Sequence, residues 1–276
     1  MESILEKKSF SEKTKKVYVS IIKRLTKLNF KMPLKKNEKV EYIRTFFDEN
    51  KLDKTSTRLD LLNLVIVLRS IEELPTDKLK DYRTELGKQR VTKNVDTMNE
   101  LKDTLMSAPD YREALIKAFE DGEWKQFIIG YLMFTYGVRN MDTDVQIVKD
   151  AKDMTDEKQN YLLLKPKKVT FYRNHYKTVK TFGKQEHVIT DPEFIKAVKK
   201  HKIGRIFPEG QMNNQMKKML INKMNESKVF KMLIDEAYDN KDTERINELS
   251  KSRGTGINTI KAFYDVNADE QIIREL

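Results

Sequence analysis

The segment that decides the fold runs from residue 160 to residue 189 and reads NYLLLKPKKVTFYRNHYKTVKTFGKQEHVI. Val, Ile, Leu, Thr, Tyr and Phe dominate it, with the partial alternation that is typical of half-buried strands. Together with the short run before it, this segment predicts three strands in a small antiparallel sheet, over Val145–Val148, Asn160–Tyr172 and Thr178–Ile189. The polar run Asn174–Lys177 is expected to form the turn between the last two strands.

Helical periodicity flanks this segment on both sides. Towards the C-terminus, helices are predicted over Pro192–Lys200, Met212–Met224, Ser227–Tyr238, Thr243–Ser250 and Ile257–Tyr264. Towards the N-terminus, helices are predicted over Asp96–Ser107, Tyr111–Phe119 and Trp124–Tyr136. The last of these should end at Gly137 as its C-cap.

The first third of the chain shows helical patterns alone. Ser11 is expected to cap a first helix, and three further helices are predicted over Val40–Phe47, Ser56–Ile71 and Leu79–Leu86. The helix over Ser56–Ile71 is apolar nearly all round, so it should be buried. The polar stretch Gly87–Asn94 is interpreted as a linker. The sequence therefore predicts a mainly α protein, with a helical domain over residues 1–90 and an α+β domain over residues 91–276.

Composition excludes several classes of site. The chain has no cysteine, which removes disulfides, thiolate zinc sites and a cysteine nucleophile. Its three histidines, His175, His187 and His201, lack the spacing of a helical metal site, so neither a metal nor a cofactor is expected. The longest apolar runs, such as Leu59–Leu68, are too short to span a membrane, and the amino terminus lacks a signal-peptide pattern. We therefore expect an intracellular protein without a membrane partner.

Positive charge is concentrated in the first third of the chain. The whole sequence has 54 Lys and Arg against 43 Asp and Glu, a formal net charge of +11. Residues 1–95 carry 23 basic and 14 acidic residues, and the remainder carries 31 and 29. Such a basic segment favours a polyanion partner, because each neutralised phosphate releases counterions. A lysine-rich, AT-biased genome would raise lysine everywhere and does not explain the uneven distribution.

A first candidate motif is YGVRNMD, over residues 136–142. An apolar helix is predicted to end there at Gly137, and Arg139 follows at once. A guanidinium presented from buried surroundings can bind phosphate oxygens through two hydrogen bonds. An ordinary helix end with a surface arginine would show the same pattern.

A second candidate motif is FYRNHYKT, over residues 171–178. Lys177 lies at the tip of the predicted hairpin, from where it could reach into a groove beside the sheet. A lysine in such a place can serve as a proton donor. The alternative is a solvated turn.

A third candidate motif is SKSRGTG, over residues 250–256, followed by a helix that ends in Tyr264. A tyrosine nucleophile suits phosphodiester chemistry, because the phosphotyrosine link keeps the bond energy for religation. The alternative is a half-buried tyrosine that anchors the last helix.

The order of these motifs behind a basic helical domain resembles the tyrosine recombinase (phage-integrase) family, in particular its divergent viral or mobile-element members. The resemblance covers nearly the whole chain. It implies a core-binding, SAM-like DNA-binding domain over residues 1–90 and a catalytic domain over residues 91–276. It also implies a site-specific recombinase or integrase that cleaves and rejoins DNA through a 3′-phosphotyrosine intermediate.

The resemblance assigns roles to three residues by their position. Arg139 matches the first catalytic arginine of the family, which follows a glycine at a helix end. Lys177 matches the hairpin lysine, which protonates the leaving 5′ oxygen. Tyr264 matches the nucleophile.

The chain departs from the family pattern at two further places. The family has a His-x-x-Arg box where this chain has Asn225 to Lys228, so Asn225 replaces the histidine and Lys228 the arginine. Thr255 occupies the place of a later histidine or tryptophan. Lysine keeps the charge but loses the two-pronged contact, so weakened catalysis is expected. Arg245 and Arg253 are alternative sources of the missing guanidinium.

The resemblance implies double-stranded DNA as the partner and a homotetramer on two duplexes. The basic residues predicted to contact DNA are Lys13, Lys15, Lys16, Lys54, Arg58, Arg90, Arg173 and Arg253. The apolar residues Ile272, Ile273 and Leu276 could form a short segment exchanged between subunits, or simply the end of a helix. The alternative functions are a catalytically degenerate relative that binds DNA as an architectural or regulatory protein, and an unrelated helical RNA-binding or structural protein.

Overall fold

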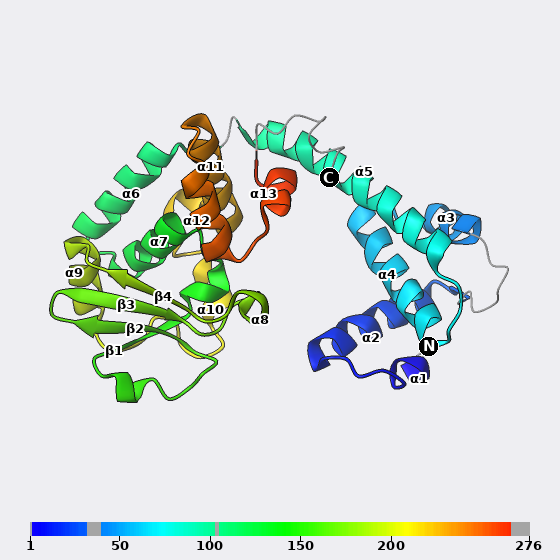
Figure 1. The fold of residues 1–276 in the computed structure, drawn as a ribbon, viewed down its shortest axis with the longest axis horizontal. Helices are drawn as coiled ribbons and strands as arrows, with labels where there is room; N and C mark the ends of the chain where they lie inside the picture. The colour runs from blue at the N-terminus through cyan, green and yellow to red at the C-terminus, as the bar shows by residue number, and fades with distance from the viewer. Residues whose placement is uncertain (1, 32–39, 103–104, 266–276) are drawn as a thin grey trace. The chain divides into compact units, whose positions relative to one another are not determined.

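The computed structural model describes residues 2–31, 40–102 and 105–265 (Figure 1). The chain divides into two compact units, Met1–Asn94, called here the N-terminal unit, and Val95–Leu276, called here the C-terminal unit. Most of the chain is helical, and one small sheet lies in the C-terminal unit. The expected mainly α class with a small sheet is therefore confirmed.

The N-terminal unit is entirely helical in its described part. Its helices are α1 (Glu2–Leu5), α2 (Glu12–Lys27), α3 (Val40–Glu49), α4 (Thr55–Ile71) and the first part of α5 (Asp77–Lys102). The side chain of Ser11 accepts a hydrogen bond from the backbone of Thr14, which confirms the predicted N-cap of α2. Helix α4 is the buried helix of this unit, with Leu62, Leu64 and Leu68 fully inaccessible. Its many apolar residues decide that position, because only a narrow polar stripe, with Ser56, Asp60 and Ser70 exposed, is left to face water.

The predicted linker over Gly87–Asn94 ends where the two units divide, but it is helical and does not separate two helices. Helix α5 continues through it without interruption, from Asp77 to Lys102. Lys, Gln and Arg favour helix, and a single glycine costs only about 1 kcal/mol in a helix interior. A polar surface helix and a polar linker therefore have similar compositions, and the composition alone does not distinguish them.

The sheet of the C-terminal unit has five strands in the order β4-β3-β2-β1-β5. The strands are β1 (Val145–Val148), β2 (Asn160–Lys165), β3 (Lys168–Arg173), β4 (Gln185–Ile189) and β5 (Gly204–Arg205). Strand β1 runs parallel to β2, whereas the other neighbours are antiparallel. The sheet is therefore mixed, and the expectation of three antiparallel strands needs correction.

Two strand predictions change in detail. The run over residues 160–172 forms the hairpin β2–β3, because Pro166 cannot donate a ladder hydrogen bond and the chain turns there. The last predicted strand, β4, begins only at Gln185, because residues Val179–Phe182 of its expected range form the short helix α8. Gly183 ends this helix with a φ of 73°, a conformation that glycine adopts without strain.

Helices cover the rest of the C-terminal unit. They are α6 (Ala108–Glu120), α7 (Trp124–Tyr136), α9 (Pro192–His201), α10 (Met212–Met216), α11 (Glu226–Asp239), α12 (Thr243–Arg253) and α13 (Ile257–Phe263), with 3₁₀ turns η1 (Asn140–Thr143), η2 (Ala151–Asp153) and η3 (Ile221–Lys223). The helix predicted over Met212–Met224 is wrong in extent. Helix α10 ends at Met216, and the 3₁₀ turn η3 begins only at Ile221, with Asn222 at a φ of 45° inside that turn.

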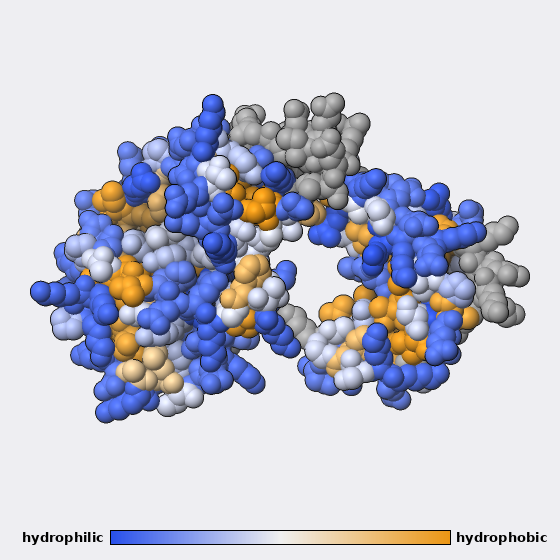
Figure 2. Space-filling view, viewed as in Figure 1, coloured by the Kyte–Doolittle hydropathy of each residue, from blue (hydrophilic) through white to orange (hydrophobic). Residues whose placement is uncertain are grey.

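One large hydrophobic core joins the sheet to α6, α7, α9 and α11. Ile128 and Leu132 of α7, Phe194 of α9 and Phe171 of β3 are all fully inaccessible within it. The face seen in Figure 2 is mostly hydrophilic, with small hydrophobic patches. Among the helices of the described ranges, none has the length and apolar character needed to cross a membrane.

Candidate active site

The end of α7 presents Arg139. Gly137 forms the predicted C-cap, with a left-handed φ of 60°. A Cβ atom at this position would lie 2.8 Å from the ring of Phe230, so only glycine fits both the conformation and the packing. The backbone N–H of Arg139, the N-cap of the 3₁₀ turn η1, then donates to the carboxylate of Asp142 within that turn. A tightly defined helix end therefore places the Arg139 side chain.

The guanidinium of Arg139 reaches the turn that follows α12. Its Nη1 donates to the backbone oxygen of Arg253 at 2.5 Å, and its Nη2 donates to Oγ1 of Thr255 at 3.0 Å. The first and third sequence motifs, more than a hundred residues apart in the chain, therefore meet in one place.

Tyr264 lies beside the same cluster at the end of α13. Its ring packs edge-on against Phe230, with 4.8 Å between the ring centroids. The guanidinium carbon of Arg253 is 5.2 Å from the Tyr264 ring centroid. The tyrosine is half-buried, and the hydrogen bonds among the described residues include none to its hydroxyl. The phenol is thus held at its ring by Phe230 and Arg253.

Arg253 is a buried member of the cluster. It is 1% exposed, and its guanidinium carbon lies 4.2 Å from the Phe230 ring centroid. Its Nη1 donates to the backbone oxygen of Gly137 at 2.8 Å, and its Nη2 lies 3.5 Å from the carboxylate of Glu226. These contacts enclose the guanidinium, so Arg253 is not on the surface as the composition suggested, and its predicted contact with DNA stays a prediction.

The altered box at residues 225–228 begins helix α11. The Asn225 side chain accepts hydrogen bonds from the backbone of Ser227 at 3.1 Å and of Lys228 at 3.0 Å. Asn225 is therefore the N-cap of α11, a role in which asparagine is strongly preferred. Lys228 is half-buried in the first helical turn, and its ammonium has no hydrogen bond or ion pair to another described residue.

Glu226 is a residue that sequence reasoning missed. Its carboxylate pairs with Arg253 and accepts a hydrogen bond from the backbone N–H of Asn140, beside Arg139. The signal that could have found it was the position of an acidic residue in the first turn of a helix, directly after an asparagine cap. Glu226 ties α11 to the turn that carries Arg139.

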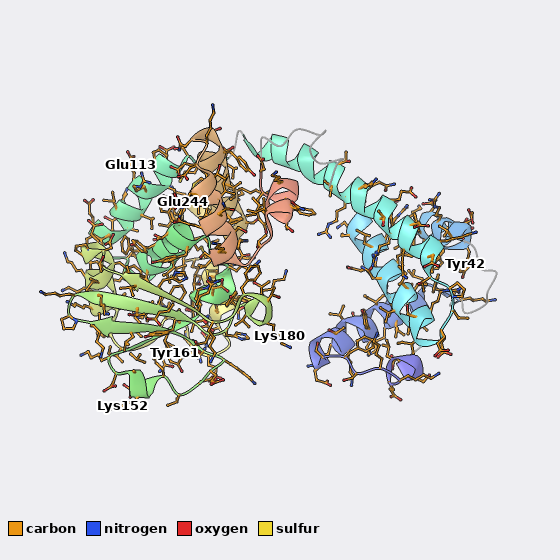
Figure 3. The ribbon with its side chains drawn as sticks, in the orientation of Figure 1. Tyr42, Glu113, Lys152, Tyr161, Lys180 and Glu244 are labelled. Atoms are coloured by element: carbon orange, nitrogen blue, oxygen red, sulfur yellow. The ribbon has the colours of Figure 1, made fainter. Side chains whose placement is uncertain are left out.

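Lys177 lies on the connection between β3 and β4 and is exposed. The preceding residue, Tyr176, is buried and donates its hydroxyl to the backbone oxygen of Gly183 at 2.6 Å. The following residue, Thr178, lies so close to Gly254 that a Cβ there would be 2.1 Å from its Oγ1. The segment that carries Lys177 is therefore held beside the turn that carries Thr255. Lys180 lies further along the same connection, in α8 (Figure 3).

Arg173 is buried beneath the site and is not accessible to DNA. It is 0% exposed, and its Nη2 donates to the carboxylate of Asp142, also 0% exposed, at 2.6 Å. Its Nη1 donates to Ser252 O and to Gln185 Oε1. The prediction of a DNA-contacting Arg173 is corrected. Arg173 fixes the end of β3 to η1 and to the end of α12, and Asp142 is a second residue of the cluster that sequence reasoning missed.

The electrostatics of the cluster are dominated by burial of cations. Desolvation lowers the pKa of Arg139, and the nearby Arg253 lowers it further. Asp142, Tyr264 and Glu226 act in the opposite direction by stabilising the charge. Two guanidinium groups and a phenol thus share one electrostatic environment, in which an incoming anion would be stabilised.

No model of a protein family matches this chain, and neither a curated protein nor a solved structure matches it.

The other predicted DNA contacts lie in the N-terminal unit. Lys16 and Lys54 are exposed, whereas Lys15 is half-buried and lies 3.6 Å from Glu12. Arg58 pairs with Asp48 at 2.6 Å. Arg90 is exposed on α5. The side chain of Lys13 and the C-terminal residues Ile272, Ile273 and Leu276 lie outside the described part of the chain.

Two other candidates are placed by the structure. Arg245 donates to the backbone oxygen of Thr135 at 2.8 Å, so it caps the end of α7. Arg253 is therefore the nearer of the two alternative guanidinium groups to Tyr264. Within the described ranges, no group of three or more His, Asp or Glu side chains could hold a metal ion.

We expect His187 to make stability depend on pH. Burial, with a contribution from Arg173, lowers the pKa of His187 from 6.5 to about 4, so the folded protein keeps this ring neutral. The unfolded chain takes up the proton first as the pH falls through 6.5. The free energy of unfolding should therefore fall between pH 6.5 and 4, by up to about 1.4 kcal/mol per pH unit.

Denaturant titrations of the native chain and of His187→Gln across this pH range measure the effect. The variant should lose stability less steeply with falling pH, because glutamine does not titrate. Parallel curves for the two proteins would contradict the assignment.

Proposed function

We propose that the chain is a site-specific DNA recombinase that cleaves and rejoins strands through a 3′-phosphotyrosine intermediate on Tyr264. The single observation that carries the proposal is the cluster of Arg139, Arg253, Thr255 and Tyr264, held together by contacts across more than a hundred residues. The resemblance of the motif order to tyrosine recombinases supports the same chemistry. The cluster therefore favours a phosphoryl-transfer centre.

In the proposed reaction, the Tyr264 oxygen attacks a DNA phosphorus and forms a phosphotyrosine bond, while the bond to the 5′ oxygen breaks. The phenol proton passes to solvent, and the Lys177 ammonium donates a proton to the leaving 5′ oxygen. In the transition state of this reaction, negative charge accumulates on the phosphoryl oxygens. Preorganised cations at the position of that charge lower the barrier, and Arg139 would serve this purpose.

Arg253 takes the place of the second arginine in this proposal, and Lys228 does not. The guanidinium of Arg253 lies against the Tyr264 ring, whereas Lys228 is joined to the cluster by no hydrogen bond or ion pair among the described residues. An arginine from the end of α12 would then supply the charge that the family box supplies from the start of α11. The departure from the family pattern at residues 225–228 would then be compatible with catalysis.

We expect Arg253→Lys to slow covalent adduct formation by up to about 10²-fold, because lysine keeps the charge and loses the fork of donors. Lys228→Gln is the matched variant and should change the rate little. Single-turnover rates of adduct formation measure both. A larger loss of rate in Lys228→Gln than in Arg253→Lys would assign the role of the second arginine to Lys228.

The proposal as a whole is tested with a suicide duplex, nicked so that the cleaved strand diffuses away. The native chain should become covalently attached to the DNA, in a complex that resists detergent and is removed by protease. Binding without any covalent complex, over a panel of random target sequences, would contradict it.

A DNA-binding protein without catalysis is the second candidate. One observation favours it: both guanidinium groups are already hydrogen-bonded to protein oxygens, Arg139 to Arg253 O and Thr255, and Arg253 to Gly137 O. An incoming phosphate would have to displace some of these partners. The suicide duplex distinguishes the two functions, because this candidate binds it and forms no adduct.

A further inference from the structure

A second basic surface lies on the C-terminal unit, away from Tyr264. A groove of about 820 Å³ is lined by Lys149, Lys165, Lys199 and Lys202, with an apolar floor of Leu164, Pro166 and Ile203. A neighbouring groove shares Pro166 and Lys199 and adds Lys167, Lys196 and Lys200. We call these two together the lysine groove. No acidic residue of the described chain lines either part.

The lysine groove is built on the β2–β3 hairpin and the end of α9. The Lys165 ammonium donates to the backbone oxygen of Lys149 at 3.0 Å, and the Lys199 ammonium donates to the backbone oxygen of Pro166 at 3.1 Å. These two lysines tie the loop after β1, the hairpin and α9 together. Contacts within the protein therefore hold the walls of the groove together.

Several of its charges have no partner within the protein. Lys149, Lys167 and Lys202 are exposed, and no hydrogen bond or ion pair among the described residues involves their ammonium groups. Like charges that line a groove with no acidic side chain in its lining repel one another, and a bound polyanion would relieve this repulsion. The groove thus has the electrostatic character of a phosphate-backbone site.

The groove is remote from the candidate active site. Strand β3 carries Lys168, beside the hairpin, at one end and Arg173, beneath the Tyr264 cluster, at the other. A strand of this length spans about 17 Å. Figure 1 also shows α9 on the side of the unit opposite to α8 and α13. A DNA phosphate bound at Tyr264 would not occupy the groove.

We infer that the lysine groove binds the sugar-phosphate backbone of a nucleic-acid duplex, as a site separate from the candidate active site. Lysine supplies point charges for phosphates without reading bases. Single-strand sites also need aromatic side chains on which bases stack, and the residues lining the groove include none. The chemistry therefore favours a duplex, and this inference does not rest on the proposed strand cleavage.

The test is the salt dependence of duplex binding by the full chain, measured by fluorescence anisotropy with a long random-sequence duplex. The groove variant is Lys149→Gln, Lys167→Gln and Lys202→Gln combined, which leaves the two structural lysines in place. The slope of log Kobs against log salt should become shallower by up to about 2.7, or about 0.9 for each phosphate that the protein no longer neutralises.

The control variant combines Lys117→Gln, Lys158→Gln and Lys241→Gln, three exposed lysines of the same unit that do not line the groove. It removes equal charge and should leave the slope close to that of the native chain. Equal slopes for the two variants would overturn the inference. Binding of two further probes, a thymidine oligonucleotide and polyglutamate, is measured with the same variants. If the groove variant loses more affinity for either probe than for the duplex, the inference is also overturned.

This equilibrium measurement is independent of covalent chemistry. A native chain that forms no adduct with the suicide duplex can still show the slope change, so failure of the proposed function and failure of this inference are separate outcomes. Thermal unfolding of both lysine variants confirms that the substitutions leave the fold intact.

Discussion

Tyr264→Phe should abolish covalent attachment to the suicide duplex completely. The substitution removes only the hydroxyl oxygen, which is the atom proposed to bond to phosphorus. The ring remains and can keep its edge-on contact with Phe230 and its place beside Arg253. Stability and duplex affinity should therefore change little, while the adduct disappears. Gel separation of the covalent complex, together with anisotropy on the same samples, measures both properties.

The matched control is Tyr172→Phe, a half-buried tyrosine on β3 of the same unit. It removes the hydroxyl of another tyrosine of the unit, one that is hydrogen-bonded to Glu186, and should leave adduct formation at the native level. If Tyr264→Phe still forms the adduct, another nucleophile is responsible, and the proposed role of Tyr264 is wrong. If Tyr172→Phe alone loses it, the phenol on β3 would be the nucleophile.

Asp142→Asn should have the largest effect on stability. It leaves the guanidinium of Arg173 buried, at 0% exposure, without its ionised partner. Removing one member of a buried ion pair typically costs about 3–5 kcal/mol, because the remaining charge has lost its compensation. The same carboxylate accepts the backbone N–H of Arg139, so the cluster should loosen together with the fold. The free energy of unfolding from denaturant titration measures the change.

Asp150→Asn is the exposed control, since Asp150 lies 3.8 Å from Lys152 at the surface. Surface pairs contribute about 0–1 kcal/mol, so this variant should remain close to the native chain. If Asp142→Asn does not fold, the double variant Asp142→Leu and Arg173→Met decides the cause. It removes both charges and should recover part of the lost stability. A double variant less stable than Asp142→Asn would show that the buried pair is not the reason.

Amphipathic periodicity was sufficient to predict most helices of this chain. Helices α4, α7 and α9 lie close to their predicted ranges, and Ser11 and Gly137 cap α2 and α7 as expected. These features depend on residues within a few positions of one another. Polar helices were harder to predict. The part of α5 over Gly87–Asn94 has no apolar stripe that would distinguish it from a linker.

The sheet was only partly predictable. Strand β1 was recognised, yet its parallel pairing with β2 depends on a crossover that no local pattern encodes. Strand β5 has two residues, too few for alternation to show. Register and strand order are decided by which apolar faces become buried together, and this is a property of the whole core.

Within the candidate site, the sequence by itself determined the identity and order of Arg139, Lys177 and Tyr264, and the cap that presents the arginine. Only the tertiary structure decided that Arg253 is enclosed beside the phenol and that Arg173 is paired with Asp142 beneath it. The residue type alone does not show whether an arginine is buried or exposed. Burial of a charge depends on partners from distant segments, because a guanidinium is stable out of water only where other chain segments supply its acceptors.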